Sequence, residues 1–246
     1  MTAAQRAVVV TGGGKGIGRA IVTRFAVAGD RVVAVGRNRD ALEATEAATA
    51  EVCDVTDEDQ VTALFERLGP IDVLVNNAGV ATSAPLERTT LDDWRAQWEV
   101  NATGAFLCTR AAIGGMMARG DGRIVIVAST AGLVGSRYTA AYTASKHATV
   151  GLMRAVAAEV AGTGVTANAV CPAYVRTEMT SRSIARIVAA TDRTEEEAEA
   201  ALIASSPLGR LLEPDEVAFA VAFLADPAAG AINGQTLVLD GGGIQS

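Results

Sequence analysis

The sequence predicts an α/β protein: a single domain with one doubly wound parallel sheet of about seven strands and helices on both faces. Short runs rich in Val and Ile alternate with stretches of helical period, and no linker interrupts them. Most of these runs are continuously apolar, as in strands that are covered on both faces. The expected strands are 7–11, 31–35, 50–53, 71–75, 123–128, 165–171 and 235–239.

Helical stretches between these strands would supply the crossovers that parallel strands need. The expected helices are 16–28, 41–48, 57–68, 91–119, 141–161, 194–204 and 214–224. Thr194 and Glu197 form a capping-box pattern, and Pro214 suits a first helical position. The longest interruption, residues 174–213, lies between the sixth and seventh strands. A segment of that length with its own helices predicts a substrate-binding lid.

Composition excludes several classes of protein. The chain of 246 residues is 50% hydrophobic, which suits one large core. A net charge of −7 without a Lys/Arg block argues against nucleic-acid or anionic-membrane partners. No apolar run approaches the ~20 residues of a membrane span, and residues 1–6 lack a secretory pattern, so we expect a cytoplasmic protein. Cys53, Cys108, Cys171 and His147 lack metal-ligand spacing, so we expect reduced core cysteines and no metal.

A glycine-rich loop follows the first expected strand and opens the first expected helix. Glycine permits a tight turn and close approach to a pyrophosphate, and the helix N-terminus offers free N–H groups. A tight turn without a ligand is the simpler alternative, but the position directly after the first strand favours a dinucleotide. The expected contacts are Gly12, Gly14, Lys15, Gly16, Ile17 and Gly18.

The end of the second strand distinguishes NAD from NADP. NAD enzymes usually place a carboxylate there for the ribose 2′-hydroxyl, whereas this strand ends at Gly36 and Arg37. A guanidinium fork with Lys15 as a second cation suits a 2′-phosphate. We therefore predict NADP(H); the alternative is that both residues are ordinary surface cations. Asp54, after the third strand, is placed to meet the adenine edge.

Tyr142 and Lys146 are four residues apart at the start of an expected helix, so their side chains share a face. The ammonium is expected to lower the tyrosine pKa from ~10, which would permit proton exchange near neutral pH. A chance surface pair would show the same spacing. Ser129 follows the fifth strand, at the sheet edge where ligands bind, and its hydroxyl can hold a carbonyl oxygen. Asn101, inside a long helix, could anchor a water on a proton path.

Together these motifs resemble the short-chain dehydrogenase/reductase family over essentially the whole chain. Ser129 precedes Tyr142 by thirteen residues, which is the family's interval. The resemblance implies a Rossmann-type fold in which Tyr142 is the general acid in reduction and Lys146 binds the nicotinamide ribose. Ser129 would polarise the carbonyl, and Asn101 would complete a water relay. The matching motifs are Thr11-Gly12-x3-Gly16-x-Gly18, Asn76-Asn77-Ala78-Gly79, Asn101, Ser129, Tyr142-x3-Lys146 and Cys171-Pro172-Ala173-Tyr174-Val175-Arg176-Thr177.

The resemblance also implies further cofactor contacts. Val55 and Asn77 would flank the adenosine, and Val175 and Thr177 would hold the carboxamide. Asn77 could equally cap a turn. Ala173 departs from the family pattern, in which glycine usually follows the proline. The expected contacts outside the glycine loop are Arg37, Asp54, Val55, Asn77, Ala78, Gly79, Tyr142, Lys146, Pro172, Val175 and Thr177.

Within the family, the chain is most similar to 3-oxoacyl reductases, aromatic polyketide ketoreductases and 3-hydroxybutyrate-type dehydrogenases. We expect hydride transfer between NADP(H) and a ketone, a 3-oxoacyl thioester or a secondary alcohol. Gly120 and Thr163 stand where carrier-protein reductases often have arginines, and an acidic chain steers an acidic carrier poorly. These features favour a free or CoA-linked substrate.

Several alternatives to this function stay open. They are a carrier-protein-linked 3-oxoacyl or polyketide ketoreductase, an NAD-dependent 3-hydroxyacyl or 3-hydroxybutyrate-type dehydrogenase and, more remotely, a non-catalytic NADP-binding sensor. The resemblance further implies a homotetramer or a dimer, in which the helices expected at 91–119 and 141–161 pair with those of a partner subunit.

Overall fold

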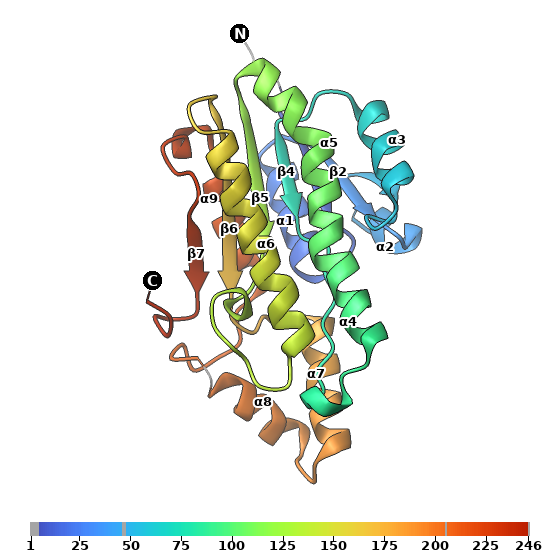
Figure 1. Cartoon of the computed structure of the whole chain (residues 1–246), viewed down its shortest axis with the longest axis vertical. Helices are drawn as coiled ribbons and strands as arrows, with labels where there is room; N and C mark the ends of the chain where they lie inside the picture. The colour runs from blue at the N-terminus through green and yellow to red at the C-terminus, as the bar shows by residue number, and fades with distance from the viewer. Residues whose placement is uncertain (1–4, 46–47, 205, 246) are drawn as a thin grey trace.

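One parallel sheet organises the molecule, with its strands in the order β3-β2-β1-β4-β5-β6-β7 (Figure 1). The structure is a computed structural model that describes residues 5–45, 48–204 and 206–245. Strand pairing is parallel throughout, so each connection crosses a face of the sheet. The strands are β1 Ala7–Thr11, β2 Arg31–Gly36, β3 Thr49–Val52, β4 Val73–Asn76, β5 Gly122–Val127, β6 Val165–Pro172 and β7 Thr236–Leu239.

Helices cover both faces of this sheet. The longer helices are α1 Gly16–Val27, α3 Glu58–Leu68, α4 Leu91–Trp98, α5 Gly104–Arg119, α6 Ala140–Glu159, α7 Glu178–Ala190, α8 Glu195–Ile203 and α9 Pro214–Leu224, and α2 is the short Arg39–Glu43. Within the described part of the chain, none of them combines the length and the apolar character that a membrane span requires.

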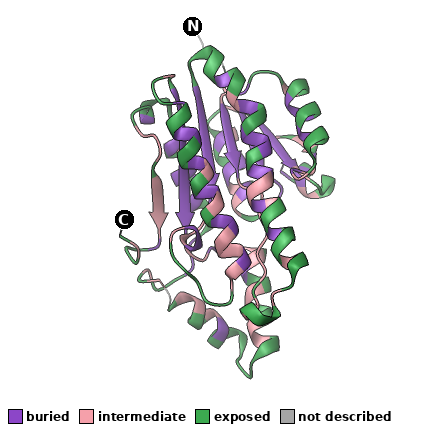
Figure 2. Cartoon of the chain, in the orientation of Figure 1, coloured by how far each residue is buried: buried purple, intermediate pink, exposed green. Residues whose placement is uncertain are grey.

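Two apolar cores lie on opposite faces of the sheet. Val8 and Val10 of β1 pack with α1 and α9 on one face, and Val9 packs on the other face with the core that includes α3, α5 and α6. Consecutive residues of β1 are therefore all buried, as are the central strands in Figure 2. Burial on both faces explains why the strands read as continuous apolar runs rather than as alternating ones.

The expected strands are confirmed, with ends that differ by at most two residues. The expectation of one unbroken helix over 91–119 was wrong. There the chain forms α4, a π-helical turn Glu99–Thr103, and α5. A π turn adds a residue to one helical turn, and such turns are frequent at functional sites. The helix expected over 41–48 is reduced to α2, and residues 46–47 of that range lie outside the described residues.

The carboxyl ends of the strands meet at one edge of the sheet, and α7 and α8 lie beyond that edge (Figure 1). Both helices fall within the interruption 174–213, in which α7 had not been placed from the sequence. The capping box that starts α8 is confirmed, because Glu197 N donates to Thr194 Oγ1 and Thr194 N donates to Glu197 Oε2. The segment expected to be a lid therefore stands over the edge where open α/β sheets bind ligands.

The turn before β6 gives a test of the fold away from that edge. Gly164 and Gly162 both have positive φ angles, of 86° and 79°. A Cβ on Gly164 would collide with the carbonyl of Gly120, whereas a Cβ on Gly162 would meet nothing within 4 Å. We expect Gly162→Ala to cost about 1 kcal/mol through backbone strain alone. Gly164→Ala should cost about 2 kcal/mol more, and equal costs for both variants in urea unfolding would contradict this packing.

Candidate active site

The expected cofactor and catalytic residues gather at the carboxyl edge of the sheet. Four segments follow neighbouring strands there, namely the glycine loop after β1 and the segments after β4, β5 and β6. The chain runs outward in both directions from the β1–β4 pair, so this pair is the point at which strand order reverses. Such a reversal opens a crevice that binds dinucleotides in doubly wound sheets.

The glycine loop brings α1 close to the end of β1. A Cβ on Gly18 would collide with the carbonyl of Gly12, so α1 can sit this near only with glycine there. Lys15 caps α1 through its backbone, without a side-chain hydrogen bond. The N–H groups of the first helical turn are thus left for an external acceptor, which is how helix N-termini bind phosphate.

The two cations expected at the 2′-phosphate are exposed and carry weak pairings. Lys15 Nζ lies 3.1 Å from Glu178 Oε2, and its side chain is 55% exposed. Arg37 Nη1 lies 3.9 Å from Asp54 Oδ2, and its side chain is 68% exposed. Exposed ion pairs contribute little free energy, so neither cation is committed to its carboxylate. Asp54 Oδ1 also accepts from the backbone and the hydroxyl of Thr56.

Asn77 joins the segment after β4 to the glycine loop. Its Nδ2 donates to the carbonyls of Thr11 and Gly12, at 2.9 and 3.3 Å. The Thr11 hydroxyl in return accepts from the N–H groups of Asn77 and Ala78, both at 3.0 Å. These bonds cross between neighbouring strands, so Asn77 does more than cap a turn. Gly79 lies next, and a Cβ there would stand 3.7 Å from Lys146 Nζ.

The segment after β6 also reaches the glycine loop. Pro172 ends β6, and Val175 is buried and forms a bridge with Leu212. Thr177 caps α7 through its hydroxyl, and its side chain lies 3.2 Å from the position of a Cβ on Gly16. Val175 and Thr177 therefore lie at the mouth of the crevice.

Val55, expected at the adenosine, is buried. Its side chain packs against Gly104, where an added Cβ would come within 2.7 Å of it. Only the backbone of Val55 is therefore left to face a ligand.

Tyr142 and Lys146 lie on the first turns of α6, as the spacing predicted. Lys146 is buried, its Nζ donates to the carbonyl of Val127 at 2.8 Å, and it lies 5.8 Å from the centre of the Tyr142 ring. Ser129 follows β5 and accepts from Ala131 N at 3.1 Å. The structure thus brings tyrosine, lysine and serine together at the end of β5.

The expected lowering of the tyrosine pKa was wrong for this structure. Burial raises the pKa of Tyr142 to about 12, and a hydrogen bond with Ser129 acts in the opposite direction. Burial also lowers the pKa of Lys146 to about 8. Loss of solvent disfavours both the phenolate and the ammonium. The spacing predicted the pair correctly, but it could not show how far burial would shift the two pKa values.

Asn101 lies in the π turn and is 2% exposed. Its amide clamps the backbone of Val80, because Oδ1 accepts from Val80 N at 2.8 Å and Nδ2 donates to Val80 O at 3.0 Å. Nδ2 also donates to Ser145 Oγ at 2.9 Å, and Ser145 donates to the carbonyl of Tyr142 at 2.8 Å. The Asn101 amide is therefore fully engaged, and its expected part in a water relay stays a prediction.

Two features of the site were not found from the sequence. Ser145 links Asn101 to Tyr142, whereas the sequence showed only that Ser145 lies within the Tyr142-x3-Lys146 motif. A cavity of about 250 Å³ lies beside the start of α6, and segments far apart in the chain contribute to it. No spacing pattern joins residues that meet only through tertiary structure.

Cys53, Cys108 and Cys171 are free and buried, as predicted. Burial raises the pKa of the Cys171 thiol to about 11. In the described ranges of the chain, no group of three or more His, Cys, Asp or Glu side chains is arranged to hold a metal ion.

Comparisons with known proteins agree with this geometry. A family model described as enoyl-(acyl carrier protein) reductase matches residues 12–243. Acetoacetyl-CoA reductase of Shinella zoogloeoides is 40% identical over 246 residues, covering 97% of this chain and 98% of the relative. D-threitol dehydrogenase of Mycolicibacterium smegmatis is 39% identical over 246 residues, covering 95% and 91%.

A solved structure is similar over nearly the whole chain. It is a variant of actinorhodin polyketide ketoreductase with NADPH, at a TM-score of 0.92 and 39% identity, covering 97% of each chain. The sheet order, the glycine loop and the serine, tyrosine and lysine at the end of β5 match the motifs by which the family is identified. The chain belongs to the short-chain dehydrogenase/reductase family and is an oxidoreductase.

Proposed function

We propose that this enzyme transfers hydride between NADP(H) and a carbonyl compound or secondary alcohol, with Tyr142 as the general acid and base. The observation that carries the proposal is the meeting of Tyr142, Ser129 and Lys146 at the end of β5, next to the segments that form the dinucleotide crevice. A phenol, a hydroxyl and an ammonium at one point are the groups needed to protonate a carbonyl oxygen as hydride reaches its carbon.

The residues present fit a dinucleotide phosphate. The free N–H groups of Gly16, Ile17 and Gly18 open α1 and would hold the pyrophosphate. Arg37 and Lys15 are exposed cations with weak pairings, and no carboxylate ends β2. When bound, the nicotinamide supplies or accepts the hydride. The NADPH bound to the polyketide ketoreductase relative agrees with this choice of cofactor.

In reduction, Ser129 would donate a hydrogen bond to the carbonyl oxygen and Tyr142 would pass its proton to the same atom. The raised pKa of Tyr142 keeps the phenol protonated at neutral pH, which is the form that this direction requires. Lys146 would stabilise the phenolate that remains, because an ammonium favours a nearby anion. Asn101 and Ser145 would position the first turn of α6 through their hydrogen bonds to Val80 and Tyr142.

The substrate would enter beneath the segment 174–213, which we propose as the lid. Names of relatives point to different substrates, a CoA thioester and a sugar alcohol among them. Gly120 and Thr163 leave the surface without the arginines that a carrier protein would engage, which supports a free or CoA-linked substrate. A non-catalytic NADP-binding sensor would keep the fold but would not need a phenol, a hydroxyl and an ammonium gathered at the end of β5.

We also propose a homo-oligomer, a tetramer or a dimer, in the cytoplasm. Trp94 and Trp98 stack at 6.2 Å on one side of α4, and each is 39% exposed. Phe106 and Met117 of α5 are exposed as well. Large apolar side chains on neighbouring helices support a subunit contact there. Light scattering on the purified protein measures the subunit number, and a monomer would contradict this proposal.

Removal of the phenol oxygen tests the catalytic assignment. Tyr142→Phe should lower kcat about a hundredfold or more, because the proton donor is lost, while the NADPH dissociation constant stays within twofold of wild type. Stopped-flow NADPH oxidation and fluorescence titration measure the two quantities. Turnover close to wild type in Tyr142→Phe would refute the assignment.

The buried ammonium predicts a pH-dependent stability. The pKa of Lys146 near 8 lies below its ordinary 10.5, so the folded state bears the cost of the charge below pH 8 and loses that cost as pH rises toward 10.5. Relative to Lys146→Met, the wild-type free energy of unfolding should therefore rise by about 2 kcal/mol between pH 7 and pH 9.5. Urea unfolding of both proteins measures it, and a pH-independent difference would show that Lys146 is not desolvated.

The cofactor choice is tested by removing one guanidinium. Arg37→Ala should raise the KM for NADPH about tenfold, the loss expected for one charge-assisted phosphate contact, and should leave the KM for NADH nearly unchanged. Arg67→Ala is the control, because Arg67 of α3 is an exposed arginine that is likewise paired with a carboxylate, that of Glu51 in β3. A wild-type preference for NADH, or equal effects of both variants, would contradict NADP(H) specificity.

A further inference from the structure

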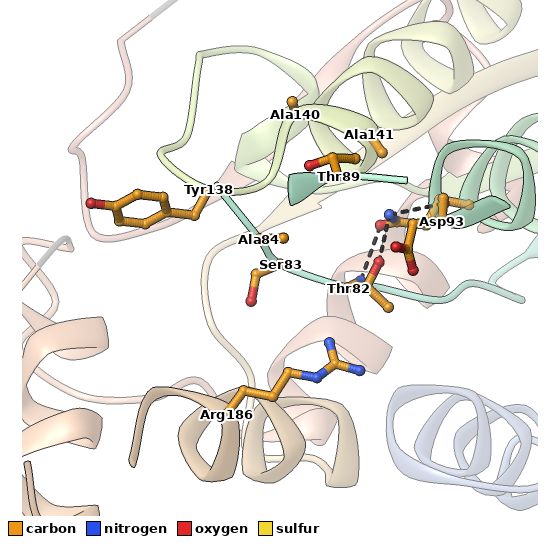
Figure 3. A pocket seen from close by; sticks show the side chains of 10 residues that line it. Thr82, Ser83, Ala84, Thr89, Asp93, Tyr138, Ala140, Ala141 and Arg186 are labelled. Carbon is orange, nitrogen blue, oxygen red and sulfur yellow. Dashed lines mark hydrogen bonds between the residues drawn. The ribbon is translucent and has the colours of Figure 1, made fainter. Parts of the chain in front are cut away.

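The cavity of about 250 Å³ is lined in part by residues next in sequence to the proposed catalytic residues. Thr82 and Ser83 come from the segment after β4, Ala140 and Ala141 directly precede Tyr142, and Arg186 comes from α7. Figure 3 shows the Arg186 side chain rising from α7 toward Thr82 and Ser83. Because Ala140 and Ala141 line it, the cavity lies beside the start of α6, which carries Tyr142.

Hydrogen-bond donors in this cavity lack strong acceptors. Arg186 makes one long hydrogen bond, from Nη1 to the carbonyl of Ala81 at 3.4 Å. Within the described residues, no carboxylate lies within ion-pair distance of it, whereas Arg176 and Arg182, which precede it in the chain, are paired with glutamates. The Ser83 hydroxyl has no hydrogen-bond partner in that part of the chain either. An arginine presents five N–H donors, so most of the Arg186 donors are available to a ligand.

The acceptors around the cavity are largely occupied. Gln97 is 1% exposed, its Oε1 accepts from Thr82 N at 3.1 Å, and its Nε2 donates to Thr82 Oγ1 at 2.7 Å. The Thr82 hydroxyl thus keeps its proton free to donate. Asp93 also lines the cavity, but its Oδ2 accepts from Thr90 Oγ1 at 2.6 Å. The site therefore offers a guanidinium and two hydroxyl donors to an acceptor, and one carboxylate that opposes an anion.

We propose that this cavity recognises a carboxylate on the substrate, so that the enzyme acts on oxo acids and the corresponding hydroxy acids. The inference rests on the proposed function, since it places the reacting carbonyl at Tyr142 and the acid group at Arg186. A guanidinium fork binds a carboxylate through two parallel hydrogen bonds, and Thr82 and Ser83 would complete its coordination. Arg186 is then the residue that selects the substrate class.

The experiment compares linear oxo acids of increasing length with their methyl esters, using NADPH and the full-length enzyme. The ester keeps the shape of the acid and removes its charge. Wild type should show a higher kcat/KM for the acid at one or two chain lengths. Arg186→Gln should lower that kcat/KM about tenfold, mainly through KM, because the contact is equal in ground and transition states. The ester should change less than twofold.

Two further variants separate a local contact from a general charge effect. Arg193→Gln removes the same charge from an exposed position outside the cavity and should leave both substrates unchanged. Asp93→Asn removes the opposing carboxylate and should raise kcat/KM for the acid without helping the ester. Phosphorylated ketones and sugar alcohols are included, because a stronger Arg186 dependence with either would replace the carboxylate assignment.

The outcomes distinguish this inference from the function on which it rests. Tyr142-dependent reduction of the esters with no preference for any acid would overturn the carboxylate site and leave the oxidoreductase assignment intact. Equal losses for acid and ester in Arg186→Gln would do the same, since they would indicate a structural role for Arg186. If no oxo compound is reduced, both proposals fail together.

Discussion

The buried ammonium of Lys146 is the constraint on which the geometry of the site depends. A cation with so little solvent contact must find a strong acceptor, and the carbonyl of Val127 at the end of β5 provides it. That bond fixes α6 against the sheet edge, one helical turn beyond Tyr142, and Ser129 follows two residues after the same carbonyl. The same burial lowers the pKa of Lys146 and raises that of Tyr142. The same burial that positions Lys146 and Tyr142 therefore also disfavours their charged forms.

Side-chain amides hold the loops around this centre. Asn77 ties the segment after β4 to the glycine loop, and Asn101 clamps the backbone of Val80 in the same segment. Ser145 then connects Asn101 to α6. Segments that follow three different strands are thus linked by side-chain hydrogen bonds, and Asn101 and Ser145 among these side chains are buried. A rigid edge of this kind holds reacting groups in position more precisely than mobile loops would.

The sequence predicted most of what depends on local pattern. The strands, the glycine loop and the placement of Ser129, Tyr142 and Lys146 follow from apolar runs and short spacings, which neighbouring residues determine. The π turn at Asn101 did not follow, and the partner of the Asn101 amide, Val80, lies twenty-one residues earlier, beyond the reach of a local pattern. The predicted direction of the Tyr142 pKa shift was also wrong, because spacing reports proximity but not desolvation. The cavity had no local signal, since Thr82, Tyr138 and Arg186 meet only in the folded chain.

The proposed catalytic groups and the proposed substrate-binding residue stand on different elements, which would let one sheet edge serve different substrates. The proposed reacting groups stand at a strand end and on α6, where burial allows little variation. Arg186 stands on α7, which belongs to an excursion between β6 and β7 and contributes little to either core. Yet α7 is not independent of the centre, because Thr177 at its start contacts Gly16 and Glu178 pairs with Lys15. The start of the helix that we propose for substrate selection therefore lies beside the loop that would bind the cofactor, while Arg186 lies two turns further along α7. A change at Arg186 is thus expected to alter specificity without displacing the catalytic groups.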